Sequence, residues 1–403
     1  MFQSLKHPGV MALTLAAAGI LMVTNGVRLA NGLFMGPINT STGLGIVTLS
    51  LALGIGQFVW GAIQPVAGAI SDRWGPRPVL LGGVLLMSLA TAITPFMSTG
   101  WGLSISLGVL SAAGAGAASF SVLIGAVAQR MPAESRGTAS GVINAGGSFG
   151  QFVFAPIAQK LIQLLGWMGA MWAMALITLA ALPLVGKVTA KTQALQANTE
   201  RDAGLKQTVK NAFKNPSYGL LHAGFFTCGF HIAFLVTHLP GEVNLCGLPP
   251  SVASWSLAII GLANIAGSLF IGSCVSKYRS KYLLVWMYGS RAVLVGWYLL
   301  MPKTALTFYI FAAGLGFTWL ATVPPTAALV GKLFGMRYMG TLFGLTLLSH
   351  QIGGFLGAWL GGLAITHQGD YSWMWCADMA LAAVAALVNL PIREAPVVRP
   401  VAA

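Results

Sequence analysis

The chain has 403 residues, of which 56% are hydrophobic and only 7% are charged, and its mean hydropathy is +0.78. Most of such a chain cannot face water, so the composition excludes a soluble globular protein and indicates an integral membrane protein. The formal charge of +14 would suit a nucleic-acid-binding protein, but the basic residues follow a membrane topology, which argues against that class.

Apolar runs of about 20 residues, long enough to cross a bilayer, recur along the whole chain. Six precede a polar stretch, near 11–36, 44–70, 78–98, 101–128, 137–163 and 167–186, and six follow it, near 217–240, 251–275, 281–301, 304–331, 337–365 and 372–392. We predict an all-α membrane protein with twelve transmembrane helices in two six-helix bundles. The bundles are residues 1–186 and 217–403, and residues 187–216 form a polar, partly helical cytoplasmic linker.

The basic residues fix the expected orientation of the chain. Eighteen of the 22 Lys and Arg residues fall on the same side of the predicted spans as both termini. By the positive-inside rule this side is the cytoplasm. The first apolar run has the length of a span and more spans follow, so we expect no cleavable signal peptide.

The two halves repeat each other. Gly137-Thr138-Ala139-Ser140-Gly141 recurs as Gly340-Thr341-Leu342-Phe343-Gly344, and Gly150 recurs as Gly353, 203 residues later. A second echo, at an offset of 200, relates residues 112–116 to residues 312–316. These echoes indicate a duplicated six-helix unit. The glycines of spans 137–163 and 337–365 predict close helix packing, which we expect between the two halves.

A charged motif joins the second and third predicted spans. It reads Gly68-Ala69-Ile70-Ser71-Asp72-Arg73-Trp74-Gly75-Pro76-Arg77. It resembles the signature of the major facilitator superfamily, and the counterpart at residues 272–281 keeps the glycine and the basic residues but has serine in place of the carboxylate. We expect Gly68 to allow close helix contact, Gly75 to make a tight turn, and the Asp72 carboxylate to pair with an arginine or a helix N-terminus.

The resemblance implies a function and a place for the substrate. In that superfamily two bundles surround a midplane cavity, lined mainly by helices 1, 4, 7 and 10, and rock to expose it to either side. By this resemblance Gly68, Asp72, Arg73, Gly75 and Arg77 would take part in conformational gating.

Ionisable residues inside spans are costly and are usually functional. Asn25, Arg28 and Asn31 share one sector of the first span. Arg28 has no carboxylate in its own span, so its guanidinium favours an anionic ligand. The alternative is a structural arginine that caps the backbone carbonyls of a broken helix.

Further candidates lie in the second half. His231 could donate a hydrogen bond to the substrate, carry a coupling proton, or be a packing residue. Arg291 could reach the cavity or form an ion pair with Asp378. Trp319 and Thr322, just before Pro324-Pro325, could enclose an apolar part of the substrate or belong to an ordinary kinked helix.

Two glycine-rich stretches resemble bacterial members of the monocarboxylate-porter branch: residues 26–34, followed by Pro37, and Cys228-Gly229-Phe230 leading to His238-Leu239-Pro240. Residues 288–292 strengthen the resemblance. Members of that branch move small organic anions by proton symport or exchange. Its best-known members carry an arginine in helix 8, whereas this span reads Asn264-Ile265-Ala266-Gly267-Ser268, so Arg291 would have to supply any second cation.

We therefore predict a secondary transporter of a small mono- or dicarboxylate in the inner membrane, with Arg28 as the principal anion ligand and a proton or counter-anion as its partner. His231, Asp378 or the substrate itself would carry the proton. We expect a monomer. The alternatives are a proton-driven drug exporter, which would need a buried carboxylate in the cavity, an importer of a siderophore-like compound, and a sensor or scaffold. No catalytic motif is present and the four cysteines are scattered, so we expect no enzyme activity, cofactor or metal.

Overall fold

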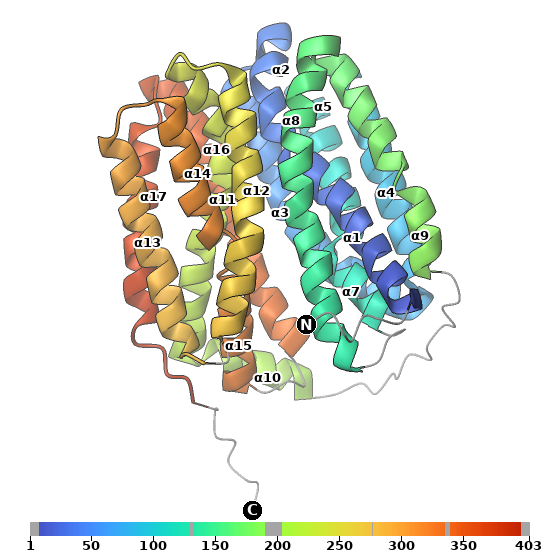
Figure 1. The fold of residues 1–403 in the computed structure, drawn as a ribbon, viewed down its shortest axis with the longest axis vertical. Helices are drawn as coiled ribbons and strands as arrows, with labels where there is room; N and C mark the ends of the chain where they lie inside the picture. Colours follow the sequence, from blue (N-terminus) through green and yellow to red (C-terminus); the bar gives the residue numbers. More distant parts are fainter. Residues whose placement is uncertain (1–7, 129–132, 190–203, 276, 335–338, 396–403) are drawn as a thin grey trace, which may run out of the picture.

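The computed structural model describes residues 8–128, 133–189, 204–275, 277–334 and 339–395, and every regular element in these ranges is a helix (Figure 1). The first half contains α1 (Pro8–Leu29), η2 (Asn31–Phe34), α2 (Met35–Thr42), α3 (Ile46–Trp74), α4 (Pro76–Ile93), η3 (Thr94–Phe96), α5 (Gly100–Leu103), η4 (Ser104–Ser111), α6 (Ala112–Ala117), α7 (Phe120–Ala128), α8 (Ala133–Leu179) and α9 (Leu182–Thr189). Then follow α10 (Gly204–Phe213), α11 (Pro216–Leu245), α12 (Pro250–Cys274), α13 (Ser280–Leu300), α14 (Ala305–Thr318), α15 (Val323–Phe334), α16 (Met339–Gln368) and α17 (Ser372–Asn389).

Ten helices in the described ranges are long and apolar enough to cross a membrane. One of them, Gly141–Thr189, covers two predicted spans, because the backbone turns at Gly166, where φ is +70°. Glycine adopts this conformation without the steric cost of a side chain. The remaining predicted span is α16, a helix of 30 residues with polar His350 and Gln351 near its centre. All twelve predicted spans are therefore present, and the prediction of the fold class is confirmed.

The two halves lie side by side, with α1–α9 on one side of Figure 1 and α11–α17 on the other. Helix α10 lies within the predicted linker, at the same end of the molecule as α7 and α15 (Figure 1). We call this end the linker end, and the opposite end, which carries α2, the far end. Residues 190–203 of the predicted linker are outside the described ranges, and the domain boundaries at 186 and 217 stay a prediction.

The repeated glycines mark the tightest helix crossings within each half. A side chain on Gly150 of α8 would overlap the carbonyl of Met22 in α1, and one on Gly353 of α16 would overlap that of Phe226 in α11. The expectation that the glycines of both helices pack between the halves is therefore wrong for most of them. In each of the two helices the small residues share one face. That face packs against α1 in the first half and against α11 in the second half.

Two pairs of helices hold the halves together. Helix α3 packs on α16, where Gly362 lies against Ser50 and Gly354 lies near Gln57. Helix α8 packs on α12, where the Asn264 amide donates a hydrogen bond to the Ser148 hydroxyl at 2.8 Å. Gly354 and Gly362 are thus the exceptions that contact the other half. On the α3 side of the same crossing, Gly54 packs against Phe355 and Gly61 packs against Gln351.

The contacts between the halves are concentrated away from the linker end. Gly32 in η2 approaches the backbone of Val236 in α11, so the first and seventh spans touch toward the far end. At the linker end, a Cβ atom added to Gly68 or Gly272 would meet no described atom within 4 Å. The same holds for Gly141 and Gly344. Among the described residues, the glycine contacts between the halves therefore lie away from the linker end.

The charged motif ends α3 and begins α4. Gly75 adopts φ +84° between these helices, which confirms the expected tight turn. A Cβ atom added to Gly68 would meet no described atom within 4 Å, so the expected close helix contact at Gly68 is not seen among the described residues and its gating role stays a prediction. Arg77 is exposed at the start of α4. The backbone of Asp72 and Arg73 belongs to α3, and their side chains are outside the described part of the structure.

Candidate functional site

The first span breaks in its middle, at the position of Arg28. Helix α1 ends at Leu29, and after Ala30 the chain continues as the 3₁₀ helix η2 and then as α2. The Asn31-Gly32 pair suits this break, because asparagine and glycine disfavour an uninterrupted helix and only glycine fits against Val236. The 3₁₀ turn winds the helix more tightly after the break, and the Arg28 side chain is directed toward the junction of the halves.

Arg28 is held by neutral partners. Its Nη1 donates a hydrogen bond to Oε1 of Gln57 in α3 at 2.9 Å, and its Nη2 donates one to Oδ1 of Asn25 at 3.3 Å. The guanidinium carbon lies 4.2 Å from the centre of the Trp60 ring. The Nε atom is buried and has no hydrogen-bond partner in the described structure. The alternative prediction, that Arg28 caps backbone carbonyls, is wrong, because its acceptors are side chains.

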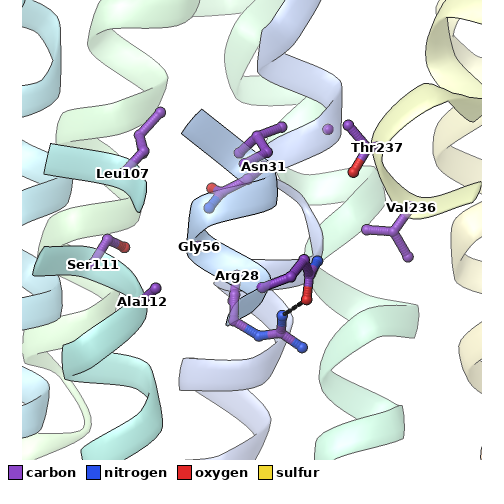
Figure 2. A pocket seen from close by; sticks show the side chains of 11 residues that line it. Arg28, Asn31, Gly56, Leu107, Ser111, Ala112, Val236 and Thr237 are labelled. Atoms are coloured by element: carbon purple, nitrogen blue, oxygen red, sulfur yellow. Dashed lines mark hydrogen bonds between the residues drawn. The ribbon is translucent and has the colours of Figure 1, made fainter. Parts of the chain in front are cut away.

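Arg28 lines a small cavity between the halves (Figure 2). The cavity measures about 20 Å³, room for about one water molecule. Its walls come from the first, second, fourth and seventh spans, and the lining residues are Arg28, Asn31, Gly32, Leu53, Gly56, Gln57, Leu107, Ser111, Ala112, Val236 and Thr237. Asn31 and Arg28 lie on one side, and Val236 and Thr237 of α11 lie across from them (Figure 2). In this conformation a substrate of several heavy atoms does not fit.

Sequence reasoning missed the second span as part of this site. Gln57 and Trp60 are three residues apart on α3, so they share a helix face, and both contact the guanidinium. A glutamine inside an apolar span is a signal that could have been read, because a buried amide needs partners. Thr237 gave a weaker signal, since threonine is common in transmembrane helices and usually bonds to its own backbone.

His231 and Asp378 form a buried hydrogen-bonded pair in the second half. Nδ1 of His231 in α11 contacts Oδ2 of Asp378 in α17, and the two side chains are 1% and 0% exposed. The remaining polar atoms, Nε2 of His231 and Oδ1 of Asp378, have no described hydrogen-bond partner. His231 is thus bonded through one ring nitrogen, and its role as a packing residue or as a proton carrier stays a prediction. The pair is a place where a proton can be held between two spans.

Arg291 does not pair with Asp378, so that alternative is wrong. Its Nη2 donates to the backbone carbonyls of Thr318 and Trp319, to the latter at 2.6 Å, and its Nε donates to the Thr318 hydroxyl at 3.2 Å. Its Nη1 lies 3.4 Å from the sulfur of Cys228 in α11. These carbonyls end α14, where the helix dipole is negative, and this explains how a buried cation is tolerated without a carboxylate.

The other candidates of the second half belong to the same buried cluster. Trp319 is 1% exposed and lies at 6.2 Å, ring centre to ring centre, from His231. Thr322 is 0% exposed, and its hydroxyl lies 3.3 Å from the Cys228 sulfur. The structure therefore places His231, Arg291, Trp319 and Thr322 together but outside the cavity at Arg28. None of them presents a surface to a ligand in this conformation.

A buried carboxylate, Glu242, was also missed. Helix α11 extends beyond the predicted span to Leu245, and Glu242 on this extension is 8% exposed. Its Oε1 accepts a hydrogen bond from the Tyr298 hydroxyl at 2.6 Å. Glu242 lies within the second half and does not line the cavity at Arg28. His238 one turn earlier contacts the carbonyl of Ala358 at 2.6 Å and acts as a structural residue.

Comparisons with known proteins agree with this architecture. The chain is 26% identical over 356 residues to monocarboxylate transporter 13 of Rattus norvegicus, a match covering 85% of this chain and 78% of that protein. It is 22% identical over 362 residues to the oxalate:formate antiporter of Oxalobacter formigenes, which covers 87% of this chain and 84% of that protein. The crystal structure of a D-xylose-proton symporter has the same fold, with a TM-score of 0.75, 14% identity, and coverage of 95% and 98%.

The family comparison covers nearly the whole chain. The sequence pattern of the Major Facilitator Superfamily matches residues 13–358 and, in an overlapping second match, residues 246–403. The helical fold agrees with these matches. The chain therefore belongs to the Major Facilitator Superfamily and is a multi-pass membrane transporter, not an enzyme.

Proposed function

We propose that this transporter moves a small organic anion, a mono- or dicarboxylate, and that Arg28 binds its carboxylate. The observation that carries the proposal is the position of Arg28: a guanidinium at the junction of the two halves, lining the cavity, with only neutral side chains as partners. A cation buried within a membrane is expensive without a counter-charge. A carboxylate ligand supplies that charge and can accept two parallel hydrogen bonds from one guanidinium.

The same geometry disfavours the alternative of a cationic drug as cargo. The charged group that lines the described cavity is positive, and a cationic ligand would be repelled there. The buried acids Asp378 and Glu242 lie inside the second half, where they already have partners. A larger siderophore-like cargo would require the cavity to open far more widely than a small acid does.

The names of two relatives support a carboxylate cargo. One is a monocarboxylate transporter and the other exchanges oxalate for formate. A monocarboxylate has one carboxyl group and oxalate has two, so the number of carboxyl groups in this transporter's substrate has to be found by experiment.

For energy coupling we propose proton symport through the His231–Asp378 pair. Both side chains change charge on binding a proton, and they join the seventh span, which contacts the first half, to the twelfth span, which does not line the cavity. In an anion exchanger the pair would be structural instead. We further propose that the protein is a monomer in the inner membrane and that its linker end faces the cytoplasm, where the positive-inside rule places the basic residues.

The proposal is tested by ligand-induced thermal stabilisation of the purified protein. A panel of acetate, lactate, oxalate and malonate is compared for the wild type and Arg28→Gln. We expect one class of acid to raise the melting temperature of the wild type, and the shift to disappear in the variant because binding weakens by about tenfold or more. Stabilisation of the wild type by neutral or cationic compounds alone would exclude a carboxylate transporter.

A further inference from the structure

Gln57 holds the position that a carboxylate would take on Arg28. Its amide oxygen accepts the hydrogen bond from Nη1 of Arg28 at 2.9 Å, the bond drawn in Figure 2. Gln57 also lines the cavity, so a ligand that approaches Arg28 from the cavity meets the same N–H group. A carboxylate that binds the guanidinium end-on, with one oxygen on Nη1 and one on Nη2, competes with the glutamine amide for Nη1.

Trp60 keeps the guanidinium in place while this exchange occurs. Its ring centre lies 4.2 Å from the guanidinium carbon, a distance at which cation–π attraction is strong. Asn25 holds Nη2 from the side of α1, and its own amide donates to the carbonyl of Gly147 in α8 at 3.3 Å. Release of Gln57 therefore leaves a positioned cation whose Nη1 is free, while Nε, on the opposite edge of the guanidinium, has no described partner.

Gln57 is at the same time part of the contact between the halves. Its Cβ lies 3.5 Å from the position that a side chain on Gly354 of α16 would take. One turn further along α3, Gly61 is closely packed by the side chain of Gln351. A movement of Gln57 away from Arg28 thus alters the packing of α3 on α16, the pair of helices that crosses between the halves.

We propose that Gln57 is a positioning residue that occupies the carboxylate position of Arg28 in the empty transporter. When the anion binds, it displaces Gln57, and this displacement changes the packing of α3 on α16. The inference rests on the proposed function, since it takes Arg28 as the anion ligand. It assigns to the second span a role in linking occupancy of the site to the relative movement of the halves.

Two variants with opposite expected effects test the proposal. Gln57→Leu removes the competing acceptor, so lactate or oxalate should bind about tenfold more tightly. Because the link to α16 is lost, exchange of the same anion in proteoliposomes should show a lower KM together with a lower maximal rate. Gln57→Glu places a carboxylate on Arg28 that competes with the substrate, so binding at pH 7 should weaken at least about tenfold.

Gln64→Leu is the matched control. Gln64 is a glutamine two turns along the same helix, and its amide oxygen accepts a bond from Ser121, away from Arg28. This variant should bind within about twofold of the wild type. The melting temperature without ligand reports folding, and Gln57→Glu should raise it, because an ion pair replaces a neutral bond.

The outcomes separate the two proposals. If the wild type responds to no carboxylate, the proposed function fails and this inference fails with it. If the wild type binds lactate or oxalate and both Gln57 variants bind within about twofold of it, Arg28 remains the anion ligand and Gln57 is only a packing residue. Should Gln57→Leu not fold, the affinity of Gln57→Glu at pH 7 decides alone, and binding within about twofold of the wild type would overturn the inference.

Discussion

Arg28 and His231 occupy equivalent positions in the two halves, 203 residues apart. Each follows by two residues a glycine that lies at a close helix crossing, Gly26 against Gly150 in the first half and Gly229 against His350 in the second. Arg28 is bound by the neutral amide of Gln57, whereas His231 is bound by the carboxylate of Asp378. In the described structure the duplicated position thus carries a cation with no carboxylate partner in one half and a histidine–carboxylate pair in the other.

This asymmetry favours different ligands for the two halves, the anion for the first half and a proton for the second. A permanent guanidinium suits an anion, and a histidine–carboxylate pair suits a proton. The His231–Asp378 pair is fully buried and has one unbonded polar atom on each residue, so it would respond strongly to loss or gain of a charge.

Substitution of His231 by glutamine should abolish proton-driven accumulation of the substrate. Breaking a buried pair leaves an uncompensated charge on Asp378 and should cost about 3–5 kcal/mol of stability. Exchange of labelled for unlabelled substrate at equal pH on both sides should continue. The measurements are uptake with and without a pH gradient in proteoliposomes, and thermal unfolding of the same preparations.

The double variant His231→Gln/Asp378→Asn serves as the control for folding. It removes both charges and keeps two side chains that can hydrogen-bond, so it should recover most of the stability while still lacking proton-driven uptake. Accumulation at the wild-type level in a stable double variant would make the pair structural.

Substitution of Arg291 should affect stability and leave substrate affinity unchanged. The guanidinium bonds to the carbonyls that end α14 and to Cys228, and it is 1% exposed. Arg291→Gln should cost about 2–3 kcal/mol, because hydrogen bonds to a charged group are lost. Arg291→Lys should not rescue the variant, because an ammonium group cannot reproduce the fork of the guanidinium.

The measurement is thermal unfolding together with carboxylate binding at a temperature where each variant is folded. A loss of binding with an unchanged melting temperature would instead place Arg291 at the substrate.

The sequence predicts the fold well because its signals are local. Span length and basic loops depend on neighbouring residues, and the 203-residue repeat needs no knowledge of packing. Arg28 is equally visible, as a single cation in an apolar run. The partners of the buried charges are not local: Asp378 lies 147 residues from His231, and only the assembled helices show that it bonds to histidine and not to Arg291.

The glycine pattern shows the same limit. The sequence reveals that α8 and α16 each carry a face of small residues, but it does not say which helix that face meets. Gly150 meets α1, and Gly353 meets α11, within the same half, whereas Gly362 meets α3 across the junction. Which neighbour a face contacts depends on helix direction and tilt, and these are set by the whole bundle.

Substitution of Gly229 by alanine should destabilise the second half. A Cβ at this position would overlap the carbonyl oxygen of His350, and because the obstacle is backbone, α11 and α16 would have to move apart. We expect a cost of about 1–3 kcal/mol, measured by thermal unfolding. Gly219→Ala on the same helix is the matched control, since Gly219 has open space around it. This control should be neutral or more stable by about 0.5–1 kcal/mol, and equal effects of the two substitutions would contradict the tight crossing.

The last prediction concerns Glu394, which follows α17 at the linker end. Its Oε1 accepts a hydrogen bond from the backbone amide of Lys281 in the first turn of α13 at 2.7 Å, and its Oε2 lies 2.9 Å from Nζ of Lys332. The repeated motif at residues 272–281 lacks the carboxylate of its first-half counterpart, and Glu394 brings one to this loop from elsewhere in the chain.

Burial opposes ionisation of Glu394, but the Lys281 amide and Lys332 outweigh it and lower the pKa of the carboxyl group. A depressed pKa in the folded state contributes stability that is complete above the unfolded pKa of about 4.3 and is lost as the pH falls below it. Glu394→Gln should therefore lower the melting temperature at pH 7. The difference from the wild type should shrink as the pH falls below about 4.3, and a difference that is constant between pH 7 and pH 3 would show that the carboxylate charge is not what stabilises this end of the protein.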